Sequence, residues 1–427
     1  MPSDSRQFHH DDSPHGEATS GLARVGSLPG SPALRGRGAA INPTNRFESL
    51  SLSQLPGEHQ LEQSIAPGEA AEMVDSQDDD GRVLKTAVFR DRSQSIINPV
   101  DSPDLHFKWT INAYRGCEHG CIYCYARPGH EYLGLSCGVD FESKIIVKHD
   151  AALLFRRELN KPSWHGEPIM MSGVTDPYQP IERSLRITRA LLEVAREFRQ
   201  PVSMITKNRL VTRDIDLLGE LAAMGAAHVA ISLTTLDPHL AQIMEPRASS
   251  PAARLSAIEQ LAGAGIPVAV MTAPIIPGIN DHELPALLEA AKAAGASSAG
   301  YVMVRLPHQI KDLFADWLDR HFPDRSAKVQ SLIRQTRAGE LYDATYGQRQ
   351  TGTGPIADVI ESTFRLFATK LGLMRQHRSE SSGIELGKHS GVPLAWDRPT
   401  PFCRPAQPSE PVKPARDVPG QLGLFGR

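Results

Sequence analysis

Short apolar runs alternate with amphipathic segments through the middle of the chain. Six of these runs predict buried parallel strands, at residues 109–113, 168–171, 202–205, 229–233, 268–273 and 301–304. Apolar residues at helical spacing follow them, for example Leu255, Ile258 and Leu261. Six βα units over about 200 residues fit either an incomplete (β/α) barrel or a doubly wound sheet. Both folds bind ligands at the carboxyl ends of their strands, so site residues are expected there.

The two ends of the chain differ in composition from its middle. Residues 1–82 are rich in Ser, Gly, Pro and acidic residues and lack a sustained apolar period, which predicts a disordered acidic tail. Residues 311–375 have the pattern of helices that would cap the core. Residues 376–427 are polar and proline-rich until the last few positions, which is typical of a flexible linker that ends in a short motif.

The length and the net charge of the chain exclude some classes of protein. A chain of 427 residues, 40% of them hydrophobic, can bury a large core, which excludes a short peptide or a coiled coil. The sequence contains neither a run of eighteen apolar residues nor a secretory signal, so we expect a cytoplasmic protein without a membrane partner. Residues 1–82 carry 13 acidic and 6 basic residues (−7), which leaves 36 of the 49 acidic and 40 of the 46 basic residues (+4) beyond them. That excess is too small to indicate nucleic-acid binding.

Three of the five cysteines, Cys117, Cys121 and Cys124, form a CxxxCxxC array directly after the first predicted strand. This crowding favours metal or redox chemistry over disulfides. Three thiolates can hold three irons of a [4Fe–4S] cluster and leave the fourth iron open to a small ligand. The alternatives are a structural zinc site with His119 or His130 as the fourth ligand, and buried thiols without a metal.

The array is part of a longer stretch, NAYRGCEHGCIYCYAR at residues 112–127, and SGVTDPYQP follows at residues 172–180. With the βα series downstream, these motifs resemble the radical S-adenosylmethionine (radical SAM) superfamily, and within it the branch labelled DNA repair photolyase, related to spore photoproduct lyase. The resemblance covers about residues 95–310 and implies a partial (β/α)6 TIM-like barrel with a helical C-terminal extension. It also implies a [4Fe–4S] cluster whose open iron binds S-adenosylmethionine. In that superfamily one electron cleaves the cofactor, and the 5′-deoxyadenosyl radical abstracts hydrogen from a substrate.

The resemblance also assigns cofactor contacts to residues near the ends of the predicted strands. In chain order these are Tyr123, Ser172, Gly173, Thr175, Asp176, Ser232, Thr234, Arg247, Ile275 and Gly278. Residues 172–176 would receive the methionyl ammonium, Ser232 and Thr234 the ribose hydroxyls, and residues 275–278 the adenine. The alternative for each is an ordinary strand-to-helix turn.

Basic and aromatic residues complete the implied cofactor site. Arg247 would neutralise the cofactor carboxylate, with Lys207 and Arg305 as alternatives at other strand ends. Tyr123 would lie near the adenine. Solvated surface charges and a core aromatic residue would explain the same sequence features.

Two further features stand outside the cluster motif. A cysteine outside the cluster returns a hydrogen atom to the product radical in spore photoproduct lyase, which makes Cys137 the candidate donor here; a small buried residue is the alternative. The sequence Gln-Leu-Gly-Leu-Phe at residues 421–425 resembles the bacterial sliding-clamp-binding pentapeptide. Its anchors would be Gln421, Leu422, Leu424 and Phe425.

We therefore expect a radical SAM enzyme that repairs or modifies DNA and needs an unidentified electron donor. One rival is a radical SAM enzyme that acts on RNA, a peptide or a small molecule, because the sequence alone shows no aromatic and basic platform for a single strand. A second rival is a non-catalytic iron–sulfur adaptor bound to the sliding clamp, and a third is a zinc module.

Overall fold

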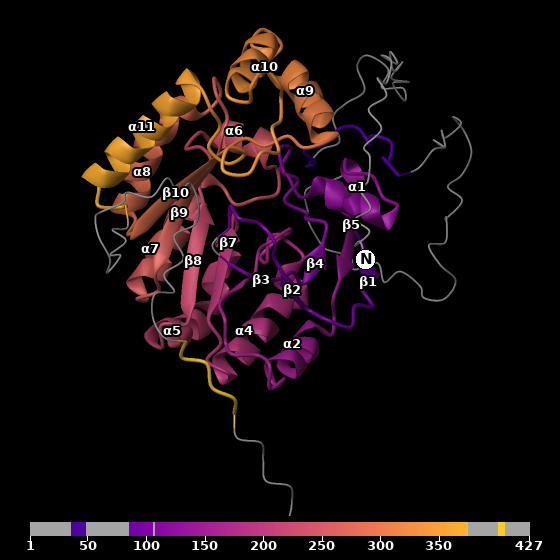
Figure 1. Cartoon of the computed structure of the whole chain (residues 1–427), viewed down its shortest axis with the longest axis vertical. Helices are drawn as coiled ribbons and strands as arrows, with labels where there is room; N and C mark the ends of the chain where they lie inside the picture. Colours follow the sequence, from indigo (N-terminus) through magenta and orange to yellow (C-terminus); the bar gives the residue numbers. More distant parts are fainter. Residues whose placement is uncertain (1–35, 48–84, 106, 375–399, 406–427) are drawn as a thin grey trace, which may run out of the picture.

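The computed structural model describes residues 36–47, 85–105, 107–374 and 400–405, and its main sheet has seven strands (Figure 1). They are β2 (Ile97–Pro99), β3 (Trp109–Ile111), β6 (Ile169–Met170), β7 (Val202–Thr206), β8 (Ala227–Ser232), β9 (Val268–Ile275) and β10 (Ser298–Met303). All but β2 are parallel, and β2 joins the edge antiparallel to β3. The six predicted strands are confirmed.

Strand order decides between the two folds that the sequence left open. The parallel strands lie side by side in chain order, from β3 through β6, β7, β8 and β9 to β10. A doubly wound sheet reverses its strand order at a switch point, whereas a (β/α) barrel adds each strand beside its predecessor. Because β10 pairs with neither β2 nor β3 in the described part of the chain, the fold is a partial (β/α)6 barrel.

Helices connect consecutive strands, and most of them pack on one side of the sheet (Figure 1), whereas the helix at residues 238–244 packs in the apolar cluster of the cysteine loop. These helices are α2 (Ala151–Leu159), α3 (Glu182–Leu185), α4 (Ile187–Glu197), α5 (Ile215–Ala223), α6 (Pro238–Met244), α7 (Pro251–Gly263) and α8 (Leu284–Ala293), with 3-10 turns η2 (Arg209–Asp214) and η3 (Asp281–Glu283). In α7, Ser250 accepts the N–H of Ala253 at 3.4 Å and Pro251 takes the first helical position. Ile258 and Leu261 then repeat at helical spacing and are buried.

A second, smaller sheet carries the cysteines. It consists of β1 (Ala87–Arg90), β5 (Lys144–Val147) and β4 (Tyr114–Arg115), and the cysteine loop follows β4 directly. The 3-10 helix η1 (Arg127–Leu133) and helix α1 (Val139–Ser143) lie between the loop and β5 in sequence. The loop therefore leads from the small sheet into η1.

Three helices follow the barrel: α9 (Ile310–His321), α10 (Ser326–Gln335) and α11 (Pro355–Lys370). In Figure 1, α9 and α10 lie over one end of the main sheet. Phe314 and Trp317 of α9 are buried in one apolar cluster with Cys121 and Ile122 of the cysteine loop. The helices after the barrel thus cover the cysteines.

Residues 36–47, which we call the strap, lie against the cysteine loop and α1 (indigo in Figure 1). The N–H groups of Gly38 and Ala39 each donate to the carboxylate of Glu142 at 2.9 Å, and Arg127 pairs with the same carboxylate. This segment differs from the disorder expected through residue 82. It packs because buried backbone donors find an acceptor, and because Gly38 has no side chain to prevent the approach.

No helix in the described ranges is long and apolar enough to cross a membrane. The anchors of the predicted clamp-binding motif, Gln421, Leu422, Leu424 and Phe425, lie outside the described residues.

Candidate active site at the carboxyl ends of the strands

The three cysteines of the array share one short loop whose start is fixed by a glycine. Gly116 has a φ of +82°, and a Cβ there would lie 2.9 Å from the carbonyl oxygen of Phe141. The next residue, Cys117, donates its N–H to that same carbonyl at 2.9 Å. Cys117 and Cys121 are buried and Cys124 is partly exposed, so the loop opens to solvent only at its third cysteine.

Without a metal, the environment of the three cysteines favours the neutral thiol form. Burial raises the pKa of all three, and at Cys117 the carboxylate of Asp176 and the other two thiols raise it further. Backbone donors oppose this effect: the N–H of Asp176 bonds to Cys117, and those of Ala126 and Arg127 bond to Cys124. Such thiols stay protonated without a metal, and a bound metal would release their protons.

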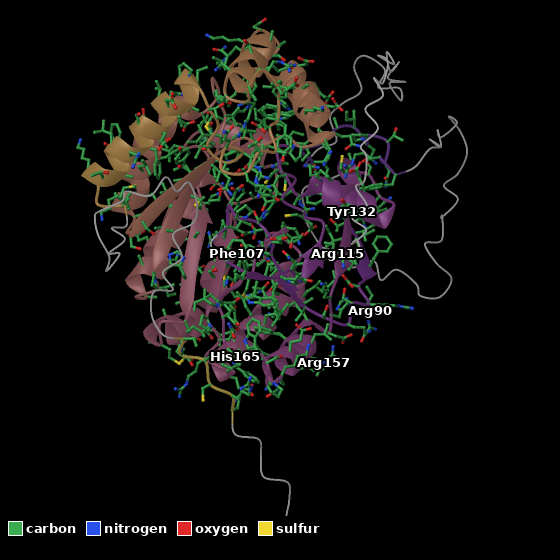
Figure 2. The ribbon with its side chains drawn as sticks, viewed as in Figure 1. Arg90, Phe107, Arg115, Tyr132, Arg157 and His165 are labelled. Carbon is green, nitrogen blue, oxygen red and sulfur yellow. The ribbon has the colours of Figure 1, made fainter. Side chains whose placement is uncertain are left out.

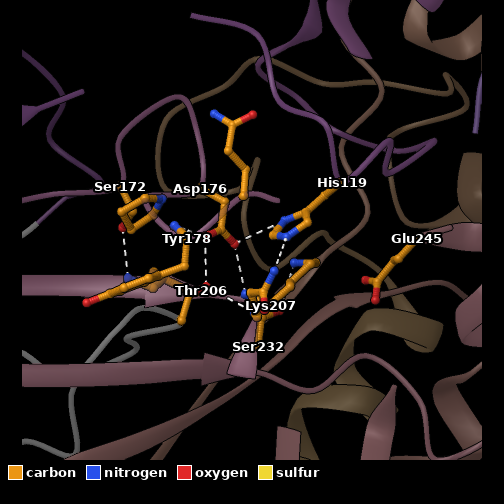
Figure 3. Close-up of polar contacts among 12 residues, drawn as sticks. His119, Ser172, Asp176, Tyr178, Thr206, Lys207, Ser232 and Glu245 are labelled. Carbon is orange, nitrogen blue, oxygen red and sulfur yellow. Dashed lines mark hydrogen bonds and ion pairs between the residues drawn. The ribbon is translucent and has the colours of Figure 1, made fainter. Parts of the chain in front are cut away.

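Asp176, which follows β6, is the centre of a polar network (Figure 3). Its Oδ2 lies 3.2 Å from Nδ1 of His119 and accepts the N–H of Lys207 at 2.8 Å, while Oδ1 accepts from Thr206 Oγ1 at 2.7 Å. Burial raises the pKa of Asp176, but His119 and the hydrogen bonds lower it more, so the net shift is downward. Nε2 of His119 lies 3.3 Å from Asn208 Nδ2. The cysteine loop is thus tied to the ends of β6 and β7.

A second network surrounds Glu245, which follows α6. Its carboxylate accepts hydrogen bonds from the hydroxyl of Tyr123 and from Thr234 Oγ1 (2.7 Å), and it pairs with Arg254. Arg254 also donates to the carbonyl oxygen of Ser232 at 3.0 Å. Burial raises the pKa of Glu245 and Arg254 opposes the rise. This network fixes the Tyr123 ring, between two of the cysteines, against the end of β8.

Lys207 places a cation between these networks. Its ammonium donates to Ser232 Oγ at 2.8 Å and lies 5.8 Å from the centroid of the Tyr123 ring. Burial lowers the pKa of Lys207, and Cys121 and Asp176 act against that shift. Thiols, a carboxylate and an ammonium therefore meet at the carboxyl ends of β6, β7 and β8, where a (β/α) barrel binds its ligands.

Comparison with known proteins follows the same region of the chain. Residues 111–291 match the model of the Radical SAM superfamily. An uncharacterized protein of Mycobacterium tuberculosis is 36% identical over 245 residues, which cover 57% of this chain and 72% of the relative. The chain belongs to the radical SAM superfamily.

This chain is also similar to two further proteins. The Radical SAM Nalpha-GlyT isomerase of Pseudomonas phage M6 is 23% identical over 263 residues, which cover 60% of this chain and 50% of that protein. A solved structure of spore photoproduct lyase complexed with dinucleoside spore photoproduct has a TM-score of 0.47 and 19% identity; the match covers 66% of this chain and 78% of that one.

Membership of the radical SAM superfamily implies a [4Fe–4S] cluster and S-adenosylmethionine, and the cysteine loop fits that cluster. In the part of the chain that the structure describes, no three His, Cys, Asp or Glu side chains converge as the ligands of a single ion would. A [4Fe–4S] cluster needs no such convergence, because each thiolate binds a different iron. Of the two histidines named for the zinc alternative, His119 contacts Asp176 and Asn208 through its two ring nitrogens, and Nε2 of His130 contacts the carbonyl oxygen of Lys144 at 2.9 Å. Family membership is what favours the cluster over zinc.

Residues 172–176, which are predicted to bind the methionyl ammonium, make several of their polar contacts with other segments of the protein. Ser172 Oγ accepts an N–H of β7 at 2.8 Å, and Thr175 Oγ1 lies 3.4 Å from a carbonyl oxygen of β4. A Cβ on Gly173 would lie 2.5 Å from Thr110 Oγ1, so the backbone runs close to β3 there. The carbonyl oxygen of Gly173 accepts the hydroxyl of Tyr125 at 2.8 Å. The contacts of this element with the cofactor stay a prediction.

The residues predicted for ribose and adenine lie at the ends of β8 and β9. Ser232 Oγ donates to the carbonyl oxygen of Ala273 at 3.1 Å, and Thr234 Oγ1 lies 3.3 Å from the same oxygen. Ile275 is buried at the end of β9. Gly278 has a φ of +79°, and a Cβ there would lie 2.8 Å from a methyl group of α10. The structure brings these residues to one edge of the sheet, and their contacts with the cofactor stay predictions.

The side chains of Arg247 and Cys137 both contact other residues of the protein. Nη1 of Arg247 lies 2.9 Å from Glu118 Oε1 and 3.3 Å from Thr86 Oγ1, so an internal carboxylate already pairs with it. Cys137 is fully buried beside Cys121 in an apolar cluster, and burial raises its pKa to about 12. These surroundings favour the structural alternative for Cys137, and both functional assignments stay predictions.

Sequence reasoning missed Glu245, Arg254 and Asn208 as parts of the site. Each is an isolated polar residue in an ordinary turn or helix, so no local spacing marks it. The strap was missed because its Gly-Arg-Gly-Ala-Ala run, at residues 36–40, has the composition of a linker. The one available signal was the pair of glycines, which permit close backbone contact.

Proposed function

We propose that this protein is a radical SAM enzyme that cleaves S-adenosylmethionine reductively to repair or modify DNA, in the manner of a photoproduct lyase. The observation that carries the proposal is the cysteine loop tied through His119 and Asp176 to the ends of β6 and β7. When bound, the reduced cluster would supply the electron that cleaves S-adenosylmethionine to a deoxyadenosyl radical.

The chain's own residues would hold the cofactor and keep water away. Lys207 would stand beside the bound cofactor as a fixed cation, since Ser232 holds its ammonium at 2.8 Å. The strap and α9 cover the cysteine loop, with Ala39 and Trp317 almost fully buried. This enclosure would protect a reactive intermediate from solvent.

An aromatic and basic pair beside the third cysteine supports DNA as the substrate. Tyr125 is 49% exposed, and the guanidinium of Arg305 lies 5.1 Å from the centroid of its ring. Exposed aromatic rings with arginine partners are surfaces on which unpaired bases stack. The two residues are distant in sequence, which is why the sequence alone showed no such platform. The pair lies next to Cys124, where chemistry at a flipped base would occur.

The test is 5′-deoxyadenosine release by anaerobically reconstituted, reduced protein given S-adenosylmethionine. Three reactions are compared: with ultraviolet-irradiated DNA, with the same DNA unirradiated, and without DNA. The proposal predicts that irradiated DNA stimulates release and that the lesion disappears from the DNA by mass spectrometry. Release that is indifferent to both DNA samples would leave a radical SAM enzyme with another substrate. An intact cluster without any release would favour a non-catalytic adaptor.

A further inference from the structure

Arg305 follows β10 and has no acidic partner in the part of the chain that the structure describes. Its guanidinium lies over the ring of Tyr125, and its Nε is buried without a hydrogen-bond partner. Within the described ranges, no carboxylate forms an ion pair with it. Arg305 is itself partly exposed and Tyr125 is half exposed, so both residues can be reached from solvent.

A second arginine lies beside the first. Arg337, just after α10, donates from Nη2 to the carbonyl oxygen of Val304 at 2.8 Å, and from Nη1 to that of Gln348 at 3.1 Å. Val304 immediately precedes Arg305, so Arg337 contacts the backbone next to Arg305 at the end of β10. Arg337 is 1% exposed, and its Nε also lacks a partner. Burial and the charge of Arg305 lower the pKa of Arg337 to about 10, so Arg337 stays charged at neutral pH.

Three other buried arginines form ion pairs of a kind that Arg305 and Arg337 do not form within the described ranges. Arg127 pairs with Glu142, Arg247 pairs with Glu118, and Arg254 pairs with Glu245, so each has an internal carboxylate. By contrast, no ion pair joins Arg305 or Arg337 to an acid among the residues described. Asp343 acts on Arg337 without forming an ion pair with it, and one such carboxylate does not balance two neighbouring cations, which repel each other. An external anion would reduce that repulsion.

We propose that Arg305 and Arg337 bind a backbone phosphate of a DNA substrate, next to a base that stacks on Tyr125. The inference rests on the proposed function, since it names the contact by which a DNA strand would enter the site. A phosphodiester carries one negative charge and several acceptor oxygens, which match guanidinium groups better than a neutral ligand would. The aromatic ring and the two guanidinium groups together match one nucleotide.

The test measures binding of a labelled single-stranded oligonucleotide to the unreduced, cluster-loaded protein, so that no turnover occurs. Arg305→Gln removes the positive charge at residue 305. Arg305→Lys keeps a positive charge there but lacks the two parallel N–H donors of a guanidinium. The matched control is Arg90→Gln, because Arg90 is exposed in β1, pairs with Asp150, and points away from the molecule on the side opposite β10 (Figures 1 and 2). Binding is measured over a range of salt concentrations and repeated with one neutral methylphosphonate linkage moved along the strand.

Arg305→Gln should weaken binding roughly ten-fold and reduce the slope of log Kd against log salt by about 0.7, the value for one lost phosphate contact on a single strand. Arg305→Lys should recover part of the affinity, and Arg90→Gln should behave as wild type. At one position along the strand, a methylphosphonate should weaken binding by the wild-type protein. The same methylphosphonate should not weaken binding by Arg305→Gln any further, because that variant has already lost the contact.

Equal affinity and slope for Arg305→Gln and Arg90→Gln would overturn the site while leaving DNA as the substrate. Weakened binding of S-adenosylmethionine, with DNA binding unchanged, would assign Arg305 to the cofactor carboxylate and equally overturn the proposal. If the wild-type protein binds no DNA and DNA does not stimulate 5′-deoxyadenosine release, the proposed function fails and this site fails with it. Arg337→Lys, checked for folding by its thermal midpoint, should lower affinity without changing that of the cofactor.

Discussion

Gly38 of the strap lies against Gly120 of the cysteine loop so closely that a Cβ on Gly38 would be 1.8 Å from the carbonyl oxygen of Gly120. The adjoining N–H groups of Gly38 and Ala39 bond to Glu142, whose carboxylate also pairs with Arg127. The strap therefore closes over the loop between Cys117 and Cys121 by backbone contact, and any side chain at residue 38 would separate the two segments.

Gly38→Ala should lift the strap from the cysteine loop. The nearest atoms are backbone, which cannot turn aside as a side chain can, so we expect a loss of about 1–3 kcal/mol in stability and faster cleavage within residues 36–47 by protease. The reconstituted cluster should also bleach faster in air. Gly129→Ala is the control, because nothing lies within 4 Å of a Cβ there. Equal air sensitivity and proteolysis in the two variants would contradict a covering role for the strap.

His130 should make stability fall between about pH 6.5 and pH 4. Burial lowers its pKa from 6.5 to about 4, so the folded state binds this proton less readily than the unfolded chain. Its contribution is therefore intact above pH 6.5, falls as the unfolded state takes up the proton, and levels off below pH 4. The loss is about 3 kcal/mol at roughly 1.4 kcal/mol per pKa unit.

Urea denaturation of His130→Gln across this range should show a shallower decline than that of wild type. His165→Gln, at an exposed histidine (Figure 2), should keep the wild-type profile. Parallel curves for wild type and His130→Gln would show that another group causes the decline.

Cysteine variants should separate the cluster ligands from the buried thiol. Cys117→Ala, Cys121→Ala and Cys124→Ala should each fail to hold a full cluster after reconstitution, measured by iron and sulfide content. Cys137→Ala should keep the cluster and the cofactor cleavage, because its side chain packs in an apolar cluster. If Cys137 is the hydrogen donor, this variant will release 5′-deoxyadenosine but accumulate incompletely repaired DNA. A repair yield equal to that of wild type would assign Cys137 to packing.

Deletion of residues 421–425 should abolish binding to a bacterial sliding clamp and leave cofactor cleavage unchanged. The expected anchors are Leu422, Leu424 and Phe425, which would fill an apolar groove while Gln421 bonds at its rim. Surface plasmon resonance with immobilised clamp measures the effect, and a variant with the order of these five residues reversed keeps the composition as a control. If the deletion variant binds the clamp as tightly as the wild-type protein does, residues 421–425 are not a clamp-binding motif.

The sequence could predict what local patterns encode. Apolar runs located the strands, and the spacing of Cys117, Cys121 and Cys124 located the cysteine loop before any fold was known. Local periodicity is the same in a barrel and in a doubly wound sheet, so only the observed strand order distinguished them. The contact of Gly38 with Glu142 spans 104 residues, and no short pattern reports a partner so distant.

Charge pairing was the least predictable part of the site. Arg247 is expected from the sequence to neutralise the cofactor carboxylate, yet Glu118 pairs with it at 2.9 Å. Arg305 looks no different in sequence, and it has no acidic partner within the described ranges. Sequence gives the identity of a charged residue, whereas its availability depends on which other charges the fold brings near.

The central claim is that the cysteine loop supports reductive cleavage of S-adenosylmethionine. The most direct measurement is 5′-deoxyadenosine formed by wild-type protein and by Cys121→Ala, both reconstituted anaerobically, reduced, and supplied with S-adenosylmethionine. We expect release by the wild-type protein and none above background by Cys121→Ala. Equal release by both proteins, or none from wild-type protein with an intact reduced cluster, would contradict the claim.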